Sequence, residues 1–143
     1  MNFQEFTEYK MSNILKIEDE ETLIAIVISN SIQPEQTQFY TETNAVLQIG
    51  HIIINPKKPI ERHFHNPIER QIVGTTEVLI LKKGRVQVSL FNKNLVEIKN
   101  VILEPGDLIY LIAGGHAFKA IEPSIFIEVK NGPFVESYDK VYF

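Results

Sequence analysis

Hydrophobic and polar residues alternate with a period of two along most of the chain, and no segment carries the apolar stripe of a helix. The clearest runs are 46–54, 77–81 and 85–91, where β-branched and other apolar residues dominate. The other expected strands are 14–17, 22–29, 95–103, 108–112, 116–121 and 125–130. Short turn signals such as Pro105-Gly106-Asp107 separate these runs. Short strands at this regular spacing predict an all-β antiparallel barrel or jelly roll with low helix content.

The length of 143 residues fits one domain with its own core, and no linker, repeat or low-complexity tract divides the chain. We therefore expect a single domain over 1–143. Within it, 46–143 would form the core of the barrel and 1–45 an N-terminal extension of strands and loops.

Charge and composition exclude several classes of protein. A net charge of -4 and scattered lysines argue against a nucleic-acid partner, which would require a basic face. The chain has no cysteine, so neither disulfides nor a thiolate metal site can form. No apolar run is long enough for a signal peptide or a membrane span. We expect a cytoplasmic protein without a membrane partner.

The residues with metal-binding chemistry form one pattern. His63 and His65 are separated by one residue, so an extended strand would direct both imidazoles to the same face. Glu77 opens the next strand, where a carboxylate directed into an apolar interior needs a cation or hydrogen bonds. His116 opens a late strand after two glycines. A lone His-x-His is more often a surface pair than a ligand pair, but the combination favours a site for one divalent metal ion.

The segment 62–118 resembles the two motifs of the cupin family. The first motif resembles His63-Phe64-His65 followed by Glu77 and, after six residues, Gly84. The second resembles the stretch 105–116, which begins at Pro-Gly-Asp and ends at His116. The resemblance implies a cupin barrel in which His63, His65, Glu77 and His116 bind the metal.

The chain departs from the family pattern in two places. Eleven residues, 66–76, separate His65 from Glu77 where the family has three or four, and Ile112 replaces a proline. Glu69 lies at the family's usual distance from His65, so it is a rival for the carboxylate ligand. Glu77 is preferred because it keeps the spacing to Gly84, and the long segment 66–76 would then be an added lid over the pocket.

A closer resemblance, over most of the chain after residue 49, is to a subgroup of uncharacterised bacterial cupins. It is carried by His65-Asn66-Pro67, by 74–79, by Gly114-Gly115-His116, by 127–133 and by 139–143. Members of this subgroup are associated with sugar and surface-polysaccharide metabolism, which implies a small polar ligand without defining a reaction.

Other side chains are candidates for a role at the metal. Arg62 and Arg70 flank the histidine pair and would clamp a carboxylate or phosphate of a ligand; the alternative is a surface ion pair. Tyr110 and Glu69 are the candidates for acid–base catalysis, although a tyrosine in this position more often packs in a core. Glu128 is expected to point outward.

Two functions follow from this site. The first is a metal-dependent enzyme acting on a small polar molecule such as a sugar or keto acid, with Fe, Mn, Ni, Co or Zn as the ion. The second is a ligand-binding or sensor protein that captures the molecule without turnover. An epimerase-like protein with a metal-free histidine base is a weaker third reading. The resemblance also implies a homodimer, because small cupins commonly pair through edge strands, and this chain has a β-rich N-terminal region to offer.

Overall fold

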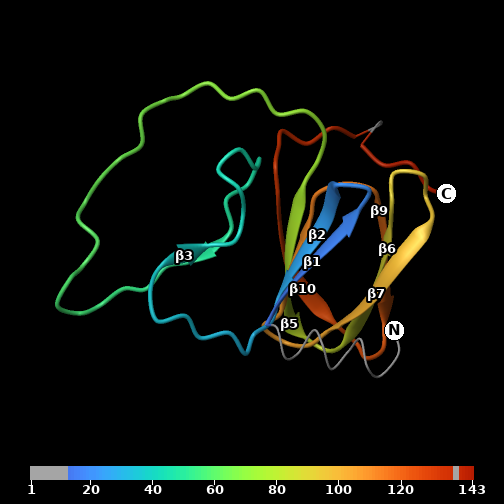
Figure 1. Cartoon of the computed structure of the whole chain (residues 1–143), viewed down its shortest axis with the longest axis horizontal. Coiled ribbons are helices and arrows are strands. Elements are labelled where there is room, and N and C mark those ends of the chain that lie inside the picture. The colour runs from blue at the N-terminus through green and yellow to red at the C-terminus, as the bar shows by residue number, and fades with distance from the viewer. Residues whose placement is uncertain (1–12, 137–138) are drawn as a thin grey trace. The chain divides into compact units, whose positions relative to one another are not determined.

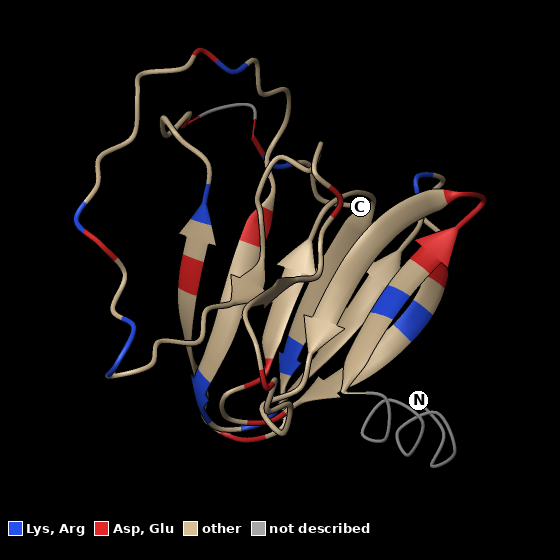
Figure 2. Cartoon of the chain, turned by 60° about the vertical axis from the view of Figure 1, so that its left-hand side comes forward, with Lys and Arg blue, Asp and Glu red and all other residues tan. Residues whose placement is uncertain are grey.

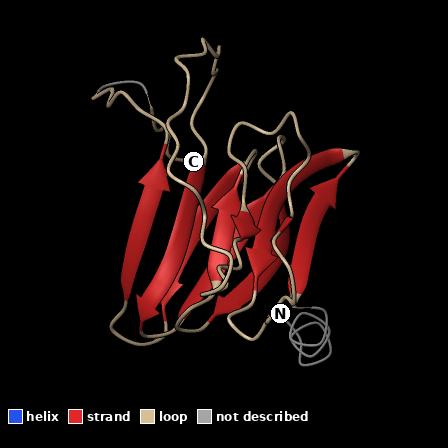
Figure 3. Cartoon of the chain, turned by 90° about the vertical axis from the view of Figure 1, so that its left-hand side faces the viewer, coloured by secondary structure: helices blue, strands red, loops and turns tan. Residues whose placement is uncertain are grey.

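The computed structural model describes residues 13–136 and 139–143, and all regular structure in these ranges is β-strand (Figure 3). The strands are β1 (Ile14–Asp19), β2 (Thr22–Ile28), β3 (Gln38–Phe39), β4 (Gly50–His51), β5 (Glu77–Lys83), β6 (Val86–Phe91), β7 (Glu97–Leu103), β8 (Leu108–Leu111), β9 (Gly115–Ala120) and β10 (Ile125–Lys130). Every pairing between them is antiparallel. The prediction of an all-β antiparallel protein is confirmed. No helix suited to crossing a membrane occurs in the described ranges.

The chain divides into two compact units. The first, here called the sandwich, comprises Met1–Ile32 and Thr75–Phe143; the second, the hairpin unit, comprises Gln33–Gly74. Each is described by itself. The expectation of one domain over 1–143 stays a prediction.

The sandwich contains two sheets (Figure 1). The larger has the strand order β1-β2-β8-β5-β10, and the smaller has the order β7-β6-β9. Each sheet ends in two edge strands, so the described strands do not close into a barrel by hydrogen bonding. Charged positions are scattered over the strands and turns (Figure 2).

The core lies between the inner faces of these two sheets. In the larger sheet, Leu79 is opposite Ile109, and both are buried. In the smaller sheet, Val88 is opposite Val101, and both are fully buried. These side chains belong to one apolar cluster, which also includes Ile17, Ile24, Ala25, Val27, Leu81, Val86, Leu90, Leu103 and Leu111. Since strand residues alternate between faces, the register decides which residues near the site point inward.

The hairpin unit differs most from the sequence expectation. The run 46–54 was predicted as a strand, but only Gly50–His51 pairs, with Gln38–Phe39. The partner strand is two residues long, and the amide of Ile53 donates to the hydroxyl of Thr37 instead of to a ladder. His51 hydrogen-bonds to the hydroxyl of Tyr40 at 2.7 Å.

The Pro105-Gly106-Asp107 turn is held by a buried carboxylate. Asp107 is fully buried, and its side chain accepts hydrogen bonds from the amides of Asn30 at 2.7 Å and Glu104 at 2.9 Å. Its carbonyl also accepts from the amide of Leu81. This one residue therefore joins the end of β2, the turn before β8 and the end of β5.

We expect Asp107→Asn to lower the free energy of unfolding by about 2–3 kcal/mol, because the amide replaces a charged acceptor of two backbone hydrogen bonds. Chemical denaturation measures this change. Glu122→Gln, at an exposed carboxylate, is the control and should change stability little. Equal stability of Asp107→Asn and the wild type would contradict this account of the turn.

Candidate metal centre

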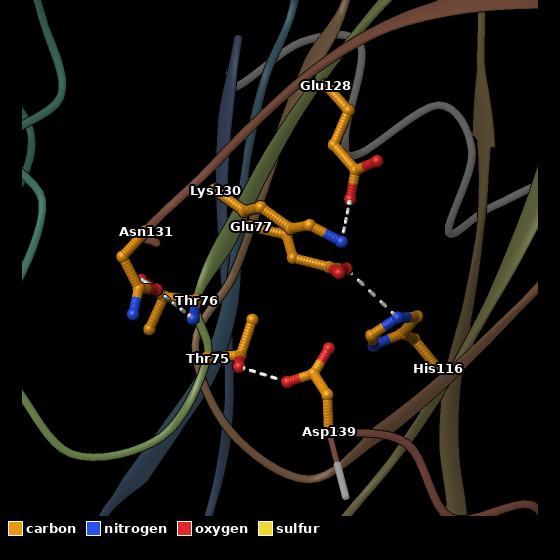
Figure 4. Close-up of polar contacts among 8 residues, drawn as sticks. All are labelled: Thr75, Thr76, Glu77, His116, Glu128, Lys130, Asn131 and Asp139. Carbon is orange, nitrogen blue, oxygen red and sulfur yellow. Dashed lines mark hydrogen bonds and ion pairs between the residues drawn. The ribbon is translucent and has the colours of Figure 1, made fainter. Parts of the chain in front are cut away.

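Glu77 and His116 are brought together from the two sheets of the sandwich, with the Glu77 side chain buried and the His116 side chain 33% exposed. Glu77 opens β5 on the same face as Leu79, a core residue, and is 8% exposed. His116 lies in β9 opposite Leu90, which is also in the core. Their side chains meet, with 3.3 Å between His116 Nε2 and Glu77 Oε2 (Figure 4). Alternation in two strands from different sheets thus places one carboxylate and one imidazole in contact.

The separation of these two atoms suits two ligands of one metal ion. Donors bound at about 2.0–2.2 Å, with ligand–metal–ligand angles between octahedral and tetrahedral values, lie about 2.8–3.6 Å apart. The 3.3 Å between Nε2 and Oε2 falls in this range. An imidazole and a carboxylate are also the donors that Fe, Mn, Co, Ni and Zn accept. The residues present therefore fit two positions of the predicted metal site.

Burial shifts both groups toward their neutral forms. It raises the pKa of the Glu77 carboxyl, and the neighbouring Glu128 carboxylate raises it further, against Lys130 and Lys140. Burial lowers the pKa of the His116 imidazole, and Lys140 lowers it further, against Glu128. The 3.3 Å contact between His116 Nε2 and Glu77 Oε2 is an ion pair only when the imidazole is protonated.

A further charged pair lies next to this contact on β10. Lys130 is opposite Glu77 in the strand register, and Glu128 is opposite Leu79. Both side chains therefore point to the inner side, and Lys130 Nζ lies 3.8 Å from Glu128 Oε1 (Figure 4). Sequence reasoning had Glu128 pointing outward and assigned no role to Lys130. Phe126 could have predicted this orientation. It packs against the core, and side chains two residues apart on a strand, such as Phe126, Glu128 and Lys130, lie on the same face.

Aromatic rings continue the same inner face away from His116. The ring of Phe118 lies 5.5 Å from the His116 ring and 5.7 Å from the Phe126 ring, edge to face in both cases. Phe126 is half-buried, and Phe118 is 41% exposed. Phe126 therefore packs against the core, whereas Phe118 is exposed.

Hydrogen bonds from neighbouring segments fix the start of β5. The amide of Thr76 donates to Asn131 Oδ1 at 2.8 Å, and the Thr75 hydroxyl donates to the Asp139 carboxylate (Figure 4). The residues around Glu77 are thus tied both to the end of β10 and to the segment 139–143.

Glycine is required at each of the two positions before His116, for a different reason at each. Gly114 has φ of +70°, and a Cβ there would lie 2.0 Å from the carbonyl oxygen of Phe91. At Gly115 a Cβ would lie 2.7 Å from the ring of Phe143. Gly114 therefore permits a tight turn, and Gly115 leaves room for the Phe143 ring.

The histidine pair lies in the hairpin unit. His63 and His65 are exposed and belong to no strand, so the prediction of an extended strand there is wrong. Pro59 and Pro67 flank the pair and cannot donate to a ladder. The two rings nevertheless lie 5.3 Å apart. Nδ1 of His63 lies 2.9 Å from the carbonyl oxygen of Glu61, which can only accept, so Nδ1 carries the proton and Nε2 keeps a lone pair for a metal.

Arg62, Glu69 and Arg70 also lie in the hairpin unit, and all three are exposed. Arg70 donates to the carbonyl of Ile68 at 3.4 Å. Their roles as ligand clamps and as a rival carboxylate stay predictions, as does the joining of His63 and His65 with Glu77 and His116 at one ion. Within the described residues, no three side chains of the metal-binding types gather closely enough to hold an ion.

Tyr110 is on the other face of the sheet from Glu77. It is opposite Val78 and Ile26, whereas Glu77 is opposite Leu111. Tyr110 is fully buried on that face, in agreement with the alternative that a tyrosine in this position packs its ring in a core. Its assignment as an acid–base catalyst stays a prediction.

Comparison with known proteins adds no relative: no family model, no curated protein and no solved structure matches the chain.

The raised pKa of Glu77 predicts a pH-dependent effect of Glu77→Gln in metal-free protein. Burial disfavours the ionised carboxylate, so the stability present below the unfolded pKa is lost as pH rises through the folded pKa. The variant cannot ionise there. We therefore expect its Tm to exceed that of the wild type by a few degrees at about pH 8, and by less at about pH 4.

Thermal unfolding across this pH range checks the expectation. Glu69→Gln, at an exposed carboxylate of the hairpin unit, is the control and should show no such trend. A Glu77→Gln protein that is less stable than the wild type at the alkaline end would mean that the ionised carboxylate is favourable in the fold.

Proposed function

We propose that this chain is a metal-binding protein of the cupin type. Glu77 and His116 would supply two ligands, and His63 and His65 the other two. The observation that carries the proposal is the 3.3 Å approach of a buried carboxylate to an imidazole at the separation of two metal ligands. A buried acid in an apolar core is costly, and a cation compensates for that cost better than a neutral imidazole does.

The activity that suits this site best is metal-dependent catalysis on a small polar molecule such as a sugar or keto acid. A bound divalent ion supplies Lewis acidity or, if it is iron, oxygen activation. The chain's own contribution is an inner face on which Lys130, Glu128 and the Phe118 ring lie beside the two ligands. These groups would bind and orient the ligand.

A second candidate is capture of the same kind of molecule without turnover, in a sensor or accessory protein. One observation favours it. Tyr110, the expected acid–base residue of the sandwich, is on the sheet face opposite Glu77. Turnover assays on isomerisation and oxygenation, with recovery of unchanged ligand as the readout, separate the two candidates.

Metal binding is tested by titrating the stripped protein with Zn²⁺, Co²⁺, Ni²⁺ and Mn²⁺ in a calorimeter. We expect one ion per chain. Glu77→Gln, His116→Gln and His63→Gln should each weaken binding by about 100-fold or more, because each removes a donor. His51→Gln is the matched control, since His51 is bonded to Tyr40 and should leave the affinity unchanged.

Glu69→Gln distinguishes the two carboxylates. Retained affinity in this variant, with loss in Glu77→Gln, supports Glu77 as the ligand, and the reverse pattern would assign Glu69. A wild-type protein that binds none of these ions would refute the proposed function.

The proposal includes a homodimer. β10 is an edge of the larger sheet, and Ile125, Ile127 and Val129 on it are each at least half exposed. Pairing of two copies along this strand would cover these side chains. Sedimentation should then show a dimer that Val129→Glu dissociates, whereas Val96→Glu, at an exposed residue outside the strands, should not. A monomeric wild type would exclude this part of the proposal.

A further inference from the structure

The free edge of β10, on the side away from β5, carries a defined row of backbone groups. Leu81 on β5 exchanges both of its backbone hydrogen bonds with the turn before β8. Because successive strand residues direct these groups to opposite sides, those of Ile80 face β10, where Ile127 is its register partner. Ile127 therefore directs its own groups to β5. The β10 residues whose N–H and C=O groups face the free edge are Phe126, Glu128 and Lys130.

The two faces of β10 differ in chemistry. The outer face carries three β-branched side chains that are each at least half exposed, namely Ile125, Ile127 and Val129. On the inner face, Phe126 packs against the core, and Glu128 and Lys130 lie 3.8 Å apart as an ion pair. A strand that fits this edge would therefore carry apolar side chains on one face and charged side chains on the other.

Residues 59–67 of the hairpin unit, here called the arm, have this pattern. The arm belongs to no strand, and all of its residues are exposed, with 86% of Phe64 accessible. In an extended conformation, one of its faces would carry Ile60, Arg62 and Phe64. The other face would carry Glu61, His63 and His65.

One antiparallel register matches both faces of the arm to those of β10. It places an acid opposite a lysine and an imidazole opposite an acid on the inner face, and an aromatic ring opposite a β-branched side chain on the outer face. The opposite pairs are Glu61 with Lys130, His63 with Glu128, and Phe64 with Ile127. The arm residues on the inner face would also exchange the backbone hydrogen bonds with the free edge.

Two prolines select this register. Pro59 and Pro67 have no N–H, and they alternate in phase with the arm residues that would bond to β10. In the register above they lie opposite Gly132 and Ser124, just beyond the two ends of β10. Moving the arm by two residues in either direction would place a proline within the ladder. Moving it by one residue would place its charged face against the exposed β-branched side chains.

We propose that the arm of a second copy of this chain adds to the free edge of β10, so that two chains exchange their arms. This inference rests on the homodimer of the proposed function and names the segment that pairs with β10. Each chain has one arm and one free β10 edge, so a twofold axis satisfies both pairings. His63 and His65 would then lie on the sheet face to which Glu77 of the other copy points.

The direction of the chain favours a second copy over the arm of the same chain. An arm paired in this register leaves β10 at its Ile125 end, whereas β5 begins opposite Lys130. Within one chain, residues 67–76 would have to run back along the whole of β10 before Glu77. An arm from a second copy has no such return to make. Gly74, with φ of +83° and nothing within 4 Å of an added Cβ, leaves the junction with β5 free to turn.

Disulfide trapping tests the exchange, and the absence of cysteine from the chain removes any background. Phe64 and Ile127 would form a pair without hydrogen bonds between them, whose side chains are close enough for a disulfide. We expect a Phe64→Cys chain and an Ile127→Cys chain, coexpressed with tags of different mass and oxidised, to give a covalent heterodimer. His63→Cys replaces Phe64→Cys in the matched control and should give none, because its side chain is on the other face.

Proline substitution tests the backbone pairing separately. Glu61→Pro removes an N–H that would donate to Lys130, so we expect the dimer to dissociate at least about tenfold more readily in sedimentation equilibrium. Arg62→Pro is the matched control. Its N–H would point away from β10, so it should change the dimer constant little. Both residues are exposed and outside the strands, so the sandwich should fold in both variants.

The outcomes separate this inference from the proposed function. A monomeric wild type would refute the homodimer and the arm exchange together, and would leave metal binding to the calorimetric titration. A dimer that forms no disulfide between the two substituted chains, or that Glu61→Pro leaves intact, would mean that the copies pair elsewhere. A doubly substituted chain that forms its disulfide at the mass of a monomer would mean that the arm closes its own sheet. Either of the last two results overturns the arm exchange alone.

Discussion

The placement of a carboxylate inside an apolar sandwich is the constraint on which this structure depends. The Glu77 side chain points to the same face of β5 as the core residues Leu79 and Leu81. Burial of its carboxylate is costly unless a hydrogen-bond partner or a cation is present. His116 meets it from the other sheet at 3.3 Å. Three features hold the residues next to this pair in place. They are the Gly114–Gly115 turn, the Thr76–Asn131 hydrogen bond and the Thr75–Asp139 hydrogen bond. The local geometry is built around one polar contact.

Much of the sandwich could be predicted from the sequence, because a period of two combined with clear turn signals is a local property. The strand expected at 125–130 has those bounds in β10, and 77–81 and 108–112 differ from β5 and β8 by at most two residues at one end. These strands depend on neighbours in the chain, so the sequence carries them directly. The pairing of Glu77 with His116, which lie in different sheets, was implied by the family resemblance and not by local pattern.

The wrong predictions concern two properties that the local sequence does not determine. One is whether a run finds a partner strand, and the other is which face of a strand is buried. The run 46–54 has the composition of a strand, but its partner is too short, so only Gly50–His51 pairs. Glu128 was placed on the wrong face, since alternation alone does not say which of two faces is buried. The register supplies that information, and it also reveals Lys130 as a neighbour of Glu77.

These placements change the set of groups known to lie at the site. With Tyr110 on the other face of the sheet, the groups beside Glu77 and His116 are Lys130, the Glu128 carboxylate and the Phe118 ring.

Anomalous diffraction from crystals of the Zn²⁺-loaded protein, recorded on both sides of the zinc absorption edge, tests the central claim most directly. The account predicts a peak within about 2.2 Å of both His116 Nε2 and Glu77 Oε2. A peak elsewhere, or none, with the imidazole and carboxylate still in direct contact, would contradict it.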